Sequence, residues 1–194
     1  MKAVGEELAD RIFYLTAKTI TATVAKETFA LLEKNGYRAK TIQITAKEKL
    51  CPCDEMECNP VTCPYAKGHF DRVNDAVFDL LHRCEMIERD DILSQADRYT
   101  VCPFELCLDT ATWADNIVCD YNYVFDPNVY LKRFFQEGIK GDYIFLIDEA
   151  HNMVERSRQM YSAQIYKEDF LTVKRIMKEH SRSIEKALEK RNKI

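Results

Sequence analysis

Hydrophobic and polar positions in the N-terminal part of the chain follow the order strand, helix, strand. Residues 11–16 (RIFYLT) form a short apolar run that predicts a buried strand. Residues 20–34 predict an amphipathic helix, which Asn35-Gly36 would end because both residues tolerate a left-handed backbone. Residues 39–45 (AKTIQIT) alternate as the next strand, so this order predicts a parallel α/β sheet. The predicted buried face of the helix comprises Ile20, Val24, Thr28, Leu31 and Leu32.

The pattern changes between residues 47 and 110. Residues 49–64 carry four cysteines and three prolines and fit no regular element. Helical spacing then predicts a long helix over residues 69–89, a second over 91–99 and a third over 104–113. The apolar stripe of the long helix comprises Phe70, Val73, Val77, Leu80, Leu81, Cys84 and Ile87.

The α/β pattern returns after these helices. Residues 116–119 predict a strand, and residues 128–136 (NVYLKRFFQ) predict a helix with Gly138 at its end. Residues 143–147 (YIFLI) form a continuous apolar run, which predicts a central parallel strand covered on both faces. Residues 166–190 predict a charged helical tail. Its weak apolar stripe comprises Ile165, Phe170, Val173 and Ile176.

Composition narrows the class of protein. A hydrophobic content of 46% and a charged content of 31% are typical of a soluble globular protein, and 194 residues suffice for one or two domains. The sequence has no long apolar run and no signal-peptide core, so we expect a cytoplasmic protein without a membrane span. The net charge of −4 does not indicate nucleic-acid binding, although a local basic groove would be sufficient.

Eight cysteines in a cytoplasmic chain favour metal ligation or burial over disulfides. Cys51, Cys58, Cys63 and Cys102 have the spacing C-x6-C-x4-C-x38-C, and prolines lie next to or near them. Four thiolates can hold tetrahedral zinc or an iron–sulfur cluster, and the spacing alone does not decide between them. The other cysteines have separate interpretations. Cys53 is a rival to Cys51, Cys84 and Cys119 are interpreted as small buried residues, and Cys107 would face the metal site without binding it.

An acidic box, Asp148-Glu149-Ala150-His151, directly follows the apolar run at 143–147. A strand that ends in Asp-Glu is the Walker B arrangement, in which the Asp holds nucleotide-bound Mg²⁺ and the Glu activates the attacking water. The carboxyl ends of parallel strands are also where α/β sheets bind ligands. The alternative is that the two acids cap a following helix. The apolar strand before the box favours the nucleotide interpretation.

Together these motifs resemble the iron–sulfur superfamily 2 DNA helicases, which include the xeroderma pigmentosum group D helicase and bacterial DinG. The resemblance covers nearly the whole chain and is closest to the DinG-like branch. FYLTAKTITATV (13–24) is similar to the second motor motif, which touches the single strand. CPFELCLDTATWADNIVCDYNYVFDP (102–127) is similar to the stretch that carries the fourth cluster cysteine. FLIDEAHN (145–152) matches the Walker B box and its following Asn.

The resemblance implies a role for each matched residue. Cys51, Cys58, Cys63 and Cys102 would ligate a [4Fe–4S] cluster. Asp148 would bind Mg²⁺, Glu149 would activate water, and His151 would couple the nucleotide site to the other motor motifs. Thr16, Lys18 and Thr19 would contact DNA phosphate. The implied partners are ATP, single-stranded DNA and single/double-strand junctions, bound by a monomeric motor that translocates 5′ to 3′.

The resemblance also implies a domain organisation. Residues 1–46 and 111–157 would belong to the first RecA-like motor domain, 47–110 to an iron–sulfur domain, and 158–194 to the start of an arch-like domain. No G-x-x-x-x-G-K-[ST] phosphate loop occurs in these residues, so we expect it before Met1 and a second motor domain after Ile194. The chain alone is then expected to have neither ATPase nor unwinding activity, and robust ATP turnover would contradict this.

Cations and aromatic residues after the third cysteine are typical of single-strand grooves. Tyr65, Lys67, His69 and Arg72 supply both, and their alternative is a solvated helix start. Tyr121 and Tyr123 are further candidates whose alternative is a core role, and Lys132-Arg133 is interpreted as a solvated helix face.

Two functional hypotheses follow. The first is a fragment of an ATP-dependent DNA helicase that contributes an iron–sulfur domain for gripping and separating strands and a Walker B motif for ATP hydrolysis. The alternative is a non-catalytic Cys₄ module, with zinc or an iron–sulfur cluster, that only binds nucleic acid or protein. A thiol redox protein is disfavoured because no C-x-x-C occurs.

Overall fold

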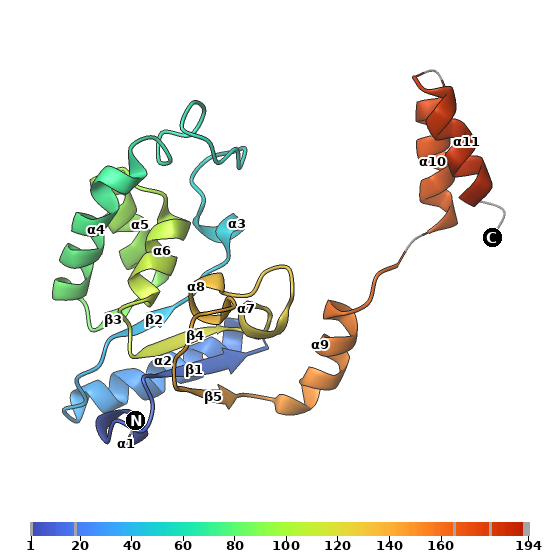
Figure 1. Cartoon of the computed structure of the whole chain (residues 1–194). Coiled ribbons are helices and arrows are strands. Elements are labelled where there is room, and N and C mark those ends of the chain that lie inside the picture. Colours follow the sequence, from blue (N-terminus) through green and yellow to red (C-terminus); the bar gives the residue numbers. More distant parts are fainter. Residues whose placement is uncertain (1, 18, 165, 179, 192–194) are drawn as a thin grey trace. The chain divides into compact units, whose positions relative to one another are not determined.

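The chain divides into two compact units, residues 1–160 and 161–194. The computed structural model describes residues 2–17, 19–164, 166–178 and 180–191 (Figure 1). No helix in these ranges is long and apolar enough to cross a membrane. The domain boundaries predicted at residues 46/47, 110/111 and 157/158, between the motor, iron–sulfur and arch-like domains, stay predictions.

The first unit is built on a parallel sheet of five strands in the order β3-β2-β4-β1-β5. In the register, Phe13 of β1 lies opposite Ile117 of β4 and Phe145 of β5. Because all strands run in the same direction, their carboxyl ends share one edge of the sheet. This confirms the predicted parallel α/β sheet. The strands are β1 (Arg11–Thr16), β2 (Thr41–Gln43), β3 (Met86–Ile87), β4 (Asn116–Asp120) and β5 (Tyr143–Ile147).

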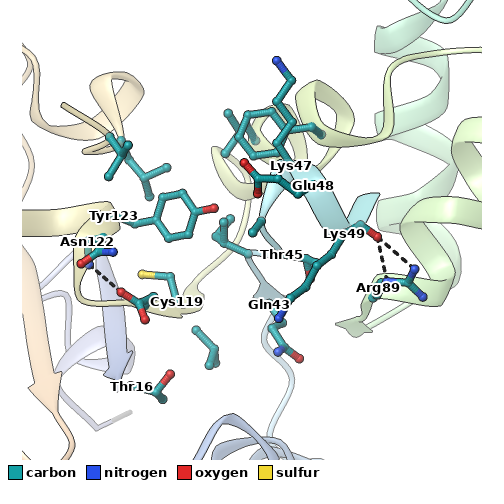
Figure 2. Close-up of a pocket in the computed structure, with 18 of the residues that line it drawn as sticks. Thr16, Gln43, Thr45, Lys47, Glu48, Lys49, Arg89, Cys119, Asn122 and Tyr123 are labelled. Carbon is teal, nitrogen blue, oxygen red and sulfur yellow. Dashed lines mark hydrogen bonds between the residues drawn. The ribbon is translucent and has the colours of Figure 1, made fainter. Parts of the chain in front are cut away.

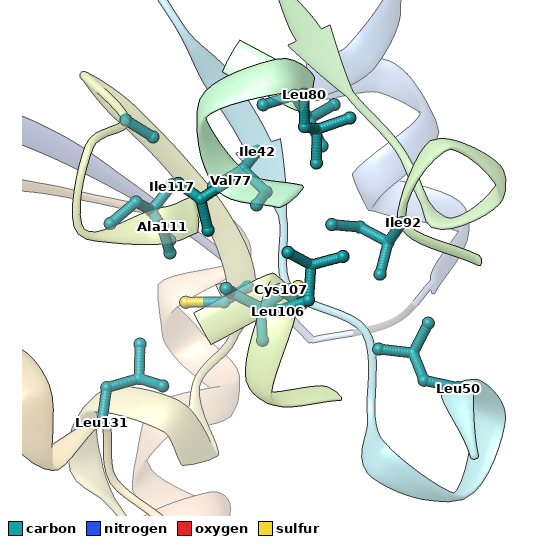
Figure 3. Packing of buried hydrophobic residues seen from close by; sticks show 14 of the residues in the cluster. Ile42, Leu50, Val77, Leu80, Ile92, Leu106, Cys107, Ala111, Ile117 and Leu131 are labelled. Carbon is teal, nitrogen blue, oxygen red and sulfur yellow. The ribbon is translucent and has the colours of Figure 1, made fainter. Parts of the chain in front are cut away.

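Helices cover both faces of this sheet. Because successive residues of a strand point to opposite faces, neighbouring residues pack against different helices. Phe13 and Ile117 belong to a large apolar cluster with residues of the helices α4 to α6. Figure 3 shows Ile117 of this cluster with Val77, Leu80 and Leu106. Val118 faces the other way and packs with Ala25 and Phe29 of α2. The helices of this unit are α1 (Lys2–Gly5), α2 (Thr19–Lys34), α3 (Lys47–Leu50), α4 (His69–Arg83), α5 (Arg89–Tyr99), α6 (Pro103–Ala111), α7 (Asn122–Phe125), α8 (Lys132–Phe135), the 3₁₀ helix η1 (Ala150–Asn152) and α9 (Met153–Met160).

Local sequence explains where the helices α4 to α6 begin and which face they bury. Residues Val73, Ala76, Val77 and Leu80 of α4 recur at helical spacing and are buried in the large apolar cluster, so truncating Leu80 to Ala would cost about 2–5 kcal/mol. At the start of α5, the side chains of Glu88 and Asp91 form a reciprocal capping box. Pro103 occupies the first turn of α6, where a missing N–H costs nothing.

The predicted helix over residues 69–89 is wrong at its C-terminal end. Helix α4 ends at Arg83, and Cys84 is already extended. Met86 and Ile87 then pair with Thr41 and Ile42 as strand β3. Ile87 is therefore buried in the sheet and not on a helical stripe, and Phe70, also assigned to that stripe, is 85% exposed. Sheet pairing overrides the helical spacing here.

The predicted buried face of α2 is right for Leu32, which packs against the cluster of Ala25, Phe29 and Val118, but wrong for Val24, Thr28 and Leu31. Val24 and Leu31 are exposed, whereas Ala25 and Phe29 are buried against the sheet. The helix is therefore rotated relative to the expected face. The side chain of Ile20 lies outside the described part of the chain.

Two segments after β4 differ from their predictions. The helix expected over residues 128–136 is reduced to α8, because the amide of Asn128 donates to the Asp126 carboxylate in a turn that takes up the first residues. Strand β5 was expected at the centre of the sheet but lies at its edge, with Leu146 45% exposed. In the described residues no strand pairs with its outer side.

The second unit contains two helices, α10 (Lys167–Met177) and α11 (Arg182–Arg191), which contact each other. The predicted charged tail is thus helical but interrupted. Val173 and Ile176 of its apolar stripe are exposed, and Ile165 lies outside the described residues.

Candidate functional site

The acidic box continues directly from β5 at the carboxyl edge of the sheet. The amide of Asp148 donates to the Leu15 carbonyl at 3.0 Å, so the ladder with β1 extends to the first acid. Glu149 has a left-handed backbone with φ of 50°, which is strained for a residue with a side chain. His151 Nδ1 lies 3.2 Å from Glu149 Oε2, and both side chains are exposed. The box therefore presents a carboxylate pair and an imidazole at the edge where parallel sheets bind ligands.

Two contacts join the acidic box to neighbouring strands. The hydroxyl of Tyr121, directly after β4, donates to the Asp148 carbonyl. Arg156 of α9 donates to the Ala17 carbonyl at 3.2 Å, directly after β1. Burial raises the pKa of Tyr121, and the negative charge of Asp148 acts in the same direction. The ends of β1, β4 and β5 are thus tied together.

A cavity of about 820 Å³ lies at the same edge of the sheet, at the carboxyl ends of β1, β2 and β4. Thr16 of β1, Gln43 of β2 and Cys119 of β4 form its floor, and α3, α6, α7 and α8 supply its walls (Figure 2). The space is large enough for a nucleotide-sized ligand.

Cations and aromatic rings line this cavity together. Lys47 and Lys49 come from α3, and Lys132 comes from α8. Arg89 also lines the cavity, where it donates to the Lys49 carbonyl at 2.9 Å. Burial raises the pKa of Tyr123 to about 12, so its phenol is neutral at physiological pH. Phosphate-binding cations beside stacking rings are what a single-strand site needs. The aromatic members are Phe104, Tyr123 and Phe134.

Four of the cysteines lie in an irregular segment between α3 and α4 (residues 51–63, the cysteine segment). A hydrogen bond with Cys58 raises the pKa of Lys47, and the charges of Cys58, Cys102 and Cys51 add to the effect. The Lys47 ammonium is therefore close to three of the predicted ligands.

The pKa of Cys53 also depends on other thiols of the cysteine segment. Desolvation, followed by hydrogen bonds with Cys63 and Cys51, raises the pKa of Cys53 to about 11. The pKa of Cys53 thus responds to Cys51 and Cys63, and that of Lys47 to Cys51, Cys58 and Cys102. Within the described residues, however, no three Cys, His, Asp or Glu side chains converge closely enough to hold a single metal ion. Thiolates are the donors that both zinc and iron–sulfur clusters prefer, so the donor chemistry fits either group.

Cys102 immediately precedes α6. Burial raises the pKa of its thiol, and hydrogen bonding from the backbone amides of Glu105 and Phe104 opposes that shift. A helix N-terminus stabilises a thiolate in this way. The remaining cysteines are packing residues. Cys107 and Cys119 are buried, as predicted for Cys119, and the thiol of Cys107 donates to the Gln43 carbonyl. Cys84 is half-buried at the end of α4 and not on its stripe.

The structure separates the predicted DNA-contacting residues into two groups. Thr16 is buried at the floor of the cavity. Lys18 and the side chain of Thr19 lie outside the described residues. Tyr65, Lys67 and Arg72 lie in and before the first turn of α4 and do not line the cavity. The guanidinium of Arg72 is hydrogen-bonded to three carbonyls.

Several cavity residues have no sequence motif that marks them. Lys47, Arg89 and Asn122 come from three separate elements, and only the fold brings them together. Lys132 lines the cavity, but Arg133 is not a solvated residue as predicted. Its guanidinium lies 2.8 Å from Glu105 and 3.0 Å from Asp109. The sequence offered one signal for these residues, because Lys47 lies only four positions before Cys51.

Comparison with known proteins gives consistent matches. Residues 22–170 match the family DEAD_2. The chain is 29% identical to the Fanconi anemia group J protein homolog of Gallus gallus over 76 residues, which cover 39% of this chain and 6% of that protein. It is 22% identical to regulator of telomere elongation helicase 1 of Homo sapiens over 149 residues, which cover 71% of this chain and 12% of that protein.

A third relative carries an activity in its name. The chain is 26% identical to ATP-dependent DNA helicase CHL1 of Vanderwaltozyma polyspora over 125 residues, which cover 62% of this chain and 14% of that protein. The chain thus spans only a small part of the length of the curated relatives that it matches, between 6% and 14% for these three.

Proposed function

The chain belongs to the DEAD_2 family, and from that premise we propose that it is part of the first motor domain of an ATP-dependent DNA helicase. In this proposal the acidic box serves the nucleotide, the cavity holds single-stranded DNA, and the cysteine segment with Cys102 holds a [4Fe–4S] cluster. The motor translocates 5′ to 3′ and acts at single/double-strand junctions.

One observation carries the proposal: a single sheet edge supports both the acidic box and the cationic, aromatic cavity. The box follows β5, the cavity floor includes the end of β1, and these two strands are neighbours. Tyr121 connects them, since it follows β4 beside the cavity and donates to the Asp148 carbonyl. A motor has to couple nucleotide hydrolysis to the grip on a strand, and sites on adjacent strands support such coupling.

The roles of the acidic residues follow from their chemistry. Asp148 would hold Mg²⁺ bound to the nucleotide, and Glu149 would orient and activate the attacking water. Glu149 has a strained left-handed backbone with φ of 50°, and His151 Nδ1 lies 3.2 Å from its carboxylate. His151 would therefore sense the state of Glu149 and pass it to the other motor motifs.

The cavity would hold nucleotides of the single strand. Lys49 and Lys132 supply cations for phosphates, and Tyr123 supplies a face on which a base can stack. Thr16, with its hydroxyl at the floor, would contact the backbone.

The raised pKa values of Lys47 and Cys53, which respond to the surrounding thiols, support the cluster assignment. Cys51, Cys58, Cys63 and Cys102 would hold the cluster, with Cys53 as the extra thiol. Such a cluster supplies a rigid covalent junction and, where its potential allows, electron transfer. Lys47 balances the negative charge of the thiolates through its hydrogen bond with Cys58.

Single-strand binding by the purified chain tests the cavity. Lys132→Glu reverses a charge in the cavity wall, and Lys34→Glu reverses an exposed charge at the end of α2 as the matched control. We expect fluorescence anisotropy with a labelled oligonucleotide to show weaker binding only for Lys132→Glu. The slope of log affinity against log salt should also fall by about 0.7 for the lost phosphate contact. Equal effects of the two variants would contradict the cavity as the strand site.

The exposed Lys67 tests whether the strand continues to the start of α4. Lys67→Glu should weaken binding in a salt-dependent way if the strand passes there. Unchanged binding would remove Lys67 from the contact surface.

A further inference from the structure

The fourth cysteine is delivered by a short connection between two helices, far in sequence from the other three. Residues 100–102 join α5 to α6, and 38 residues separate Cys63 from Cys102. Thr100 has a left-handed backbone with φ of 51°, and Val101 is fully buried. The position of the Cys102 thiol therefore depends on what holds this connection.

Arg72 ties the connection to the start of α4. Its Nε donates to the Tyr99 carbonyl at 2.8 Å, and its Nη2 donates to the Thr100 carbonyl at 2.6 Å and to the Lys67 carbonyl at 2.8 Å. Lys67 closely follows Cys63, and its amide donates back to the Cys63 carbonyl at 3.2 Å. One guanidinium thus bridges the chain after the third cysteine and the chain before the fourth.

His69 makes the contact with Cys102 itself. The amide of Cys102 donates to His69 Nδ1 at 3.2 Å, so this nitrogen is the acceptor and the ring proton is on Nε2. The ring is buried, with 4% of the residue exposed. Nε2 makes no hydrogen bond and lies 3.9 Å from Asp109 Oδ2.

Asp109 lies between His69 and the cavity wall. Its Oδ1 lies 3.0 Å from Arg133 Nη2, and Arg133 lines the cavity. Hydrogen bonds from outside the ligand set orient metal ligands, and a buried imidazole that accepts from the amide of Cys102 is placed to do so. The first turn of α4 therefore links the cysteine connection to α6 and α8.

We propose that His69 and Arg72 are positioning residues that hold the connection at residues 99–102 so that Cys102 faces the thiols of the cysteine segment. This inference rests on the proposed function, because it takes Cys102 as a cluster ligand. It reassigns both residues from DNA contact to support of the metal site.

The rate of iron loss tests the role of His69. The cluster-loaded chain is mixed anaerobically with an excess of ferrous chelator, and the decay of visible absorbance is followed. His69→Leu removes the acceptor and should lose iron about fivefold faster, the effect of one lost hydrogen bond. His69→Asn keeps an acceptor near the Nδ1 position and should restore a rate within about twofold of the original chain. His82→Leu, on the exposed side of α4, is the control and should have no effect.

A parallel pair tests Arg72. Arg72→Lys keeps the charge but cannot bridge three carbonyls, so iron loss should again be about fivefold faster or more. Arg98→Lys changes an exposed arginine of α5 that pairs with Asp79 and should leave the rate unchanged. Circular dichroism of the iron-free variants checks that they fold. Should His69→Leu not fold, His69→Gln replaces it, because its acceptor sits one carbon farther out.

The outcomes distinguish failure of the positioning role from failure of the proposed cluster. Faster iron loss in the Leu and Lys variants with rescue by Asn supports the positioning role. Equal rates in all variants, or an Asn variant as fast as the Leu variant, would overturn it while leaving the cluster in place. A wild-type chain that takes up no iron on reconstitution would overturn the proposed function and this inference with it.

Discussion

At the scale of single residues, Gly68 has no room for a side chain. Its φ is +66°, and an added Cβ would lie 2.6 Å from Arg72 Nη1. The guanidinium cannot withdraw without losing its bonds to the Tyr99, Thr100 and Lys67 carbonyls. We expect Gly68→Ala to lower the free energy of unfolding by about 2–3 kcal/mol, from the left-handed backbone and about one lost hydrogen bond. Urea unfolding of the chain measures this.

Gly36 provides the matched control for that prediction. Its φ is +91°, but an added Cβ would meet nothing within 4 Å. Gly36→Ala should therefore cost only the backbone strain, about 1 kcal/mol. Equal losses in the two variants would show that Arg72 tolerates the methyl group.

Buried thiols make a prediction about alkaline pH. Burial raises the pKa of Cys107 to about 12, from an ordinary value of 9.0. A raised pKa means that the folded state favours the neutral thiol, so its contribution to stability is complete below pH 9.0 and is lost as the pH rises toward 12. The free energy of unfolding should fall by about 1.4 kcal/mol per pH unit in that window on account of this group.

Cys107→Ala tests the assignment of that slope. The variant lacks the titrating thiol, so its stability should fall less steeply between pH 9 and 11 than that of the original chain, by about 1.4 kcal/mol per unit. The cavity left by the sulfur shifts both ends of the curve equally and does not affect the comparison. Parallel curves would contradict the burial of a neutral thiol at this position.

At the scale of elements, Arg133 fastens α8 to α6. Its Nη2 lies 2.8 Å from Glu105 and 3.0 Å from Asp109. Burial raises the pKa of Asp109, and the charge of Arg133 opposes that shift. Arg133→Gln leaves a half-buried carboxylate unpaired and should destabilise the chain by about 1–2 kcal/mol at pH 7, a figure reduced because solvent screens both side chains.

The neighbouring Lys132→Gln is the control for this contact. Lys132 is exposed and lines the cavity, so its replacement should change the free energy of unfolding by less than about 0.5 kcal/mol. Thermal unfolding of both variants measures the difference. An Arg133→Gln variant as stable as Lys132→Gln would show that the pairs add nothing to the packing of α8.

Sequence patterns predicted the strands with the strongest apolar runs. Strands β1 and β5 begin and end where expected, and β4 differs by one residue, because a short apolar run bounded by polar residues leaves little choice of boundary. Strand β3 was missed because Ile87 fits both a helical stripe and a strand, and only its pairing with Ile42 decides. The edge position of β5 depends on strand order, which periodicity does not contain.

The candidate site divides in the same way. Asp148 was recognised because a motif and its strand are contiguous in sequence. Lys47, Arg89 and Lys132 were not assigned to a site, because they come from elements far apart along the chain that converge only at the sheet edge. Arg72 was assigned to DNA on composition, whereas its donors reach three carbonyls. Charge along a sequence does not reveal which cations already have partners.

At the scale of the whole molecule, the cluster should control the stability of residues 47–110 more than that of the sheet. The proposed ligands would join the cysteine segment to the start of α6, and metal binding couples to folding in such sites. Removing the cluster should therefore increase backbone hydrogen exchange first in residues 47–110, before β1 and β4. A uniform increase across the chain, or none, would contradict a local role of the metal.

The central claim is that this chain carries an iron–sulfur cluster as part of a helicase motor. An anaerobic visible absorption spectrum, with iron and sulfide analysis of the purified and reconstituted chain, tests it most directly. We predict a broad brown absorbance with about four irons and four sulfides per chain, as expected for a Cys₄ [4Fe–4S] site. A colourless chain that holds one zinc, or that takes up no iron on reconstitution, would contradict the account.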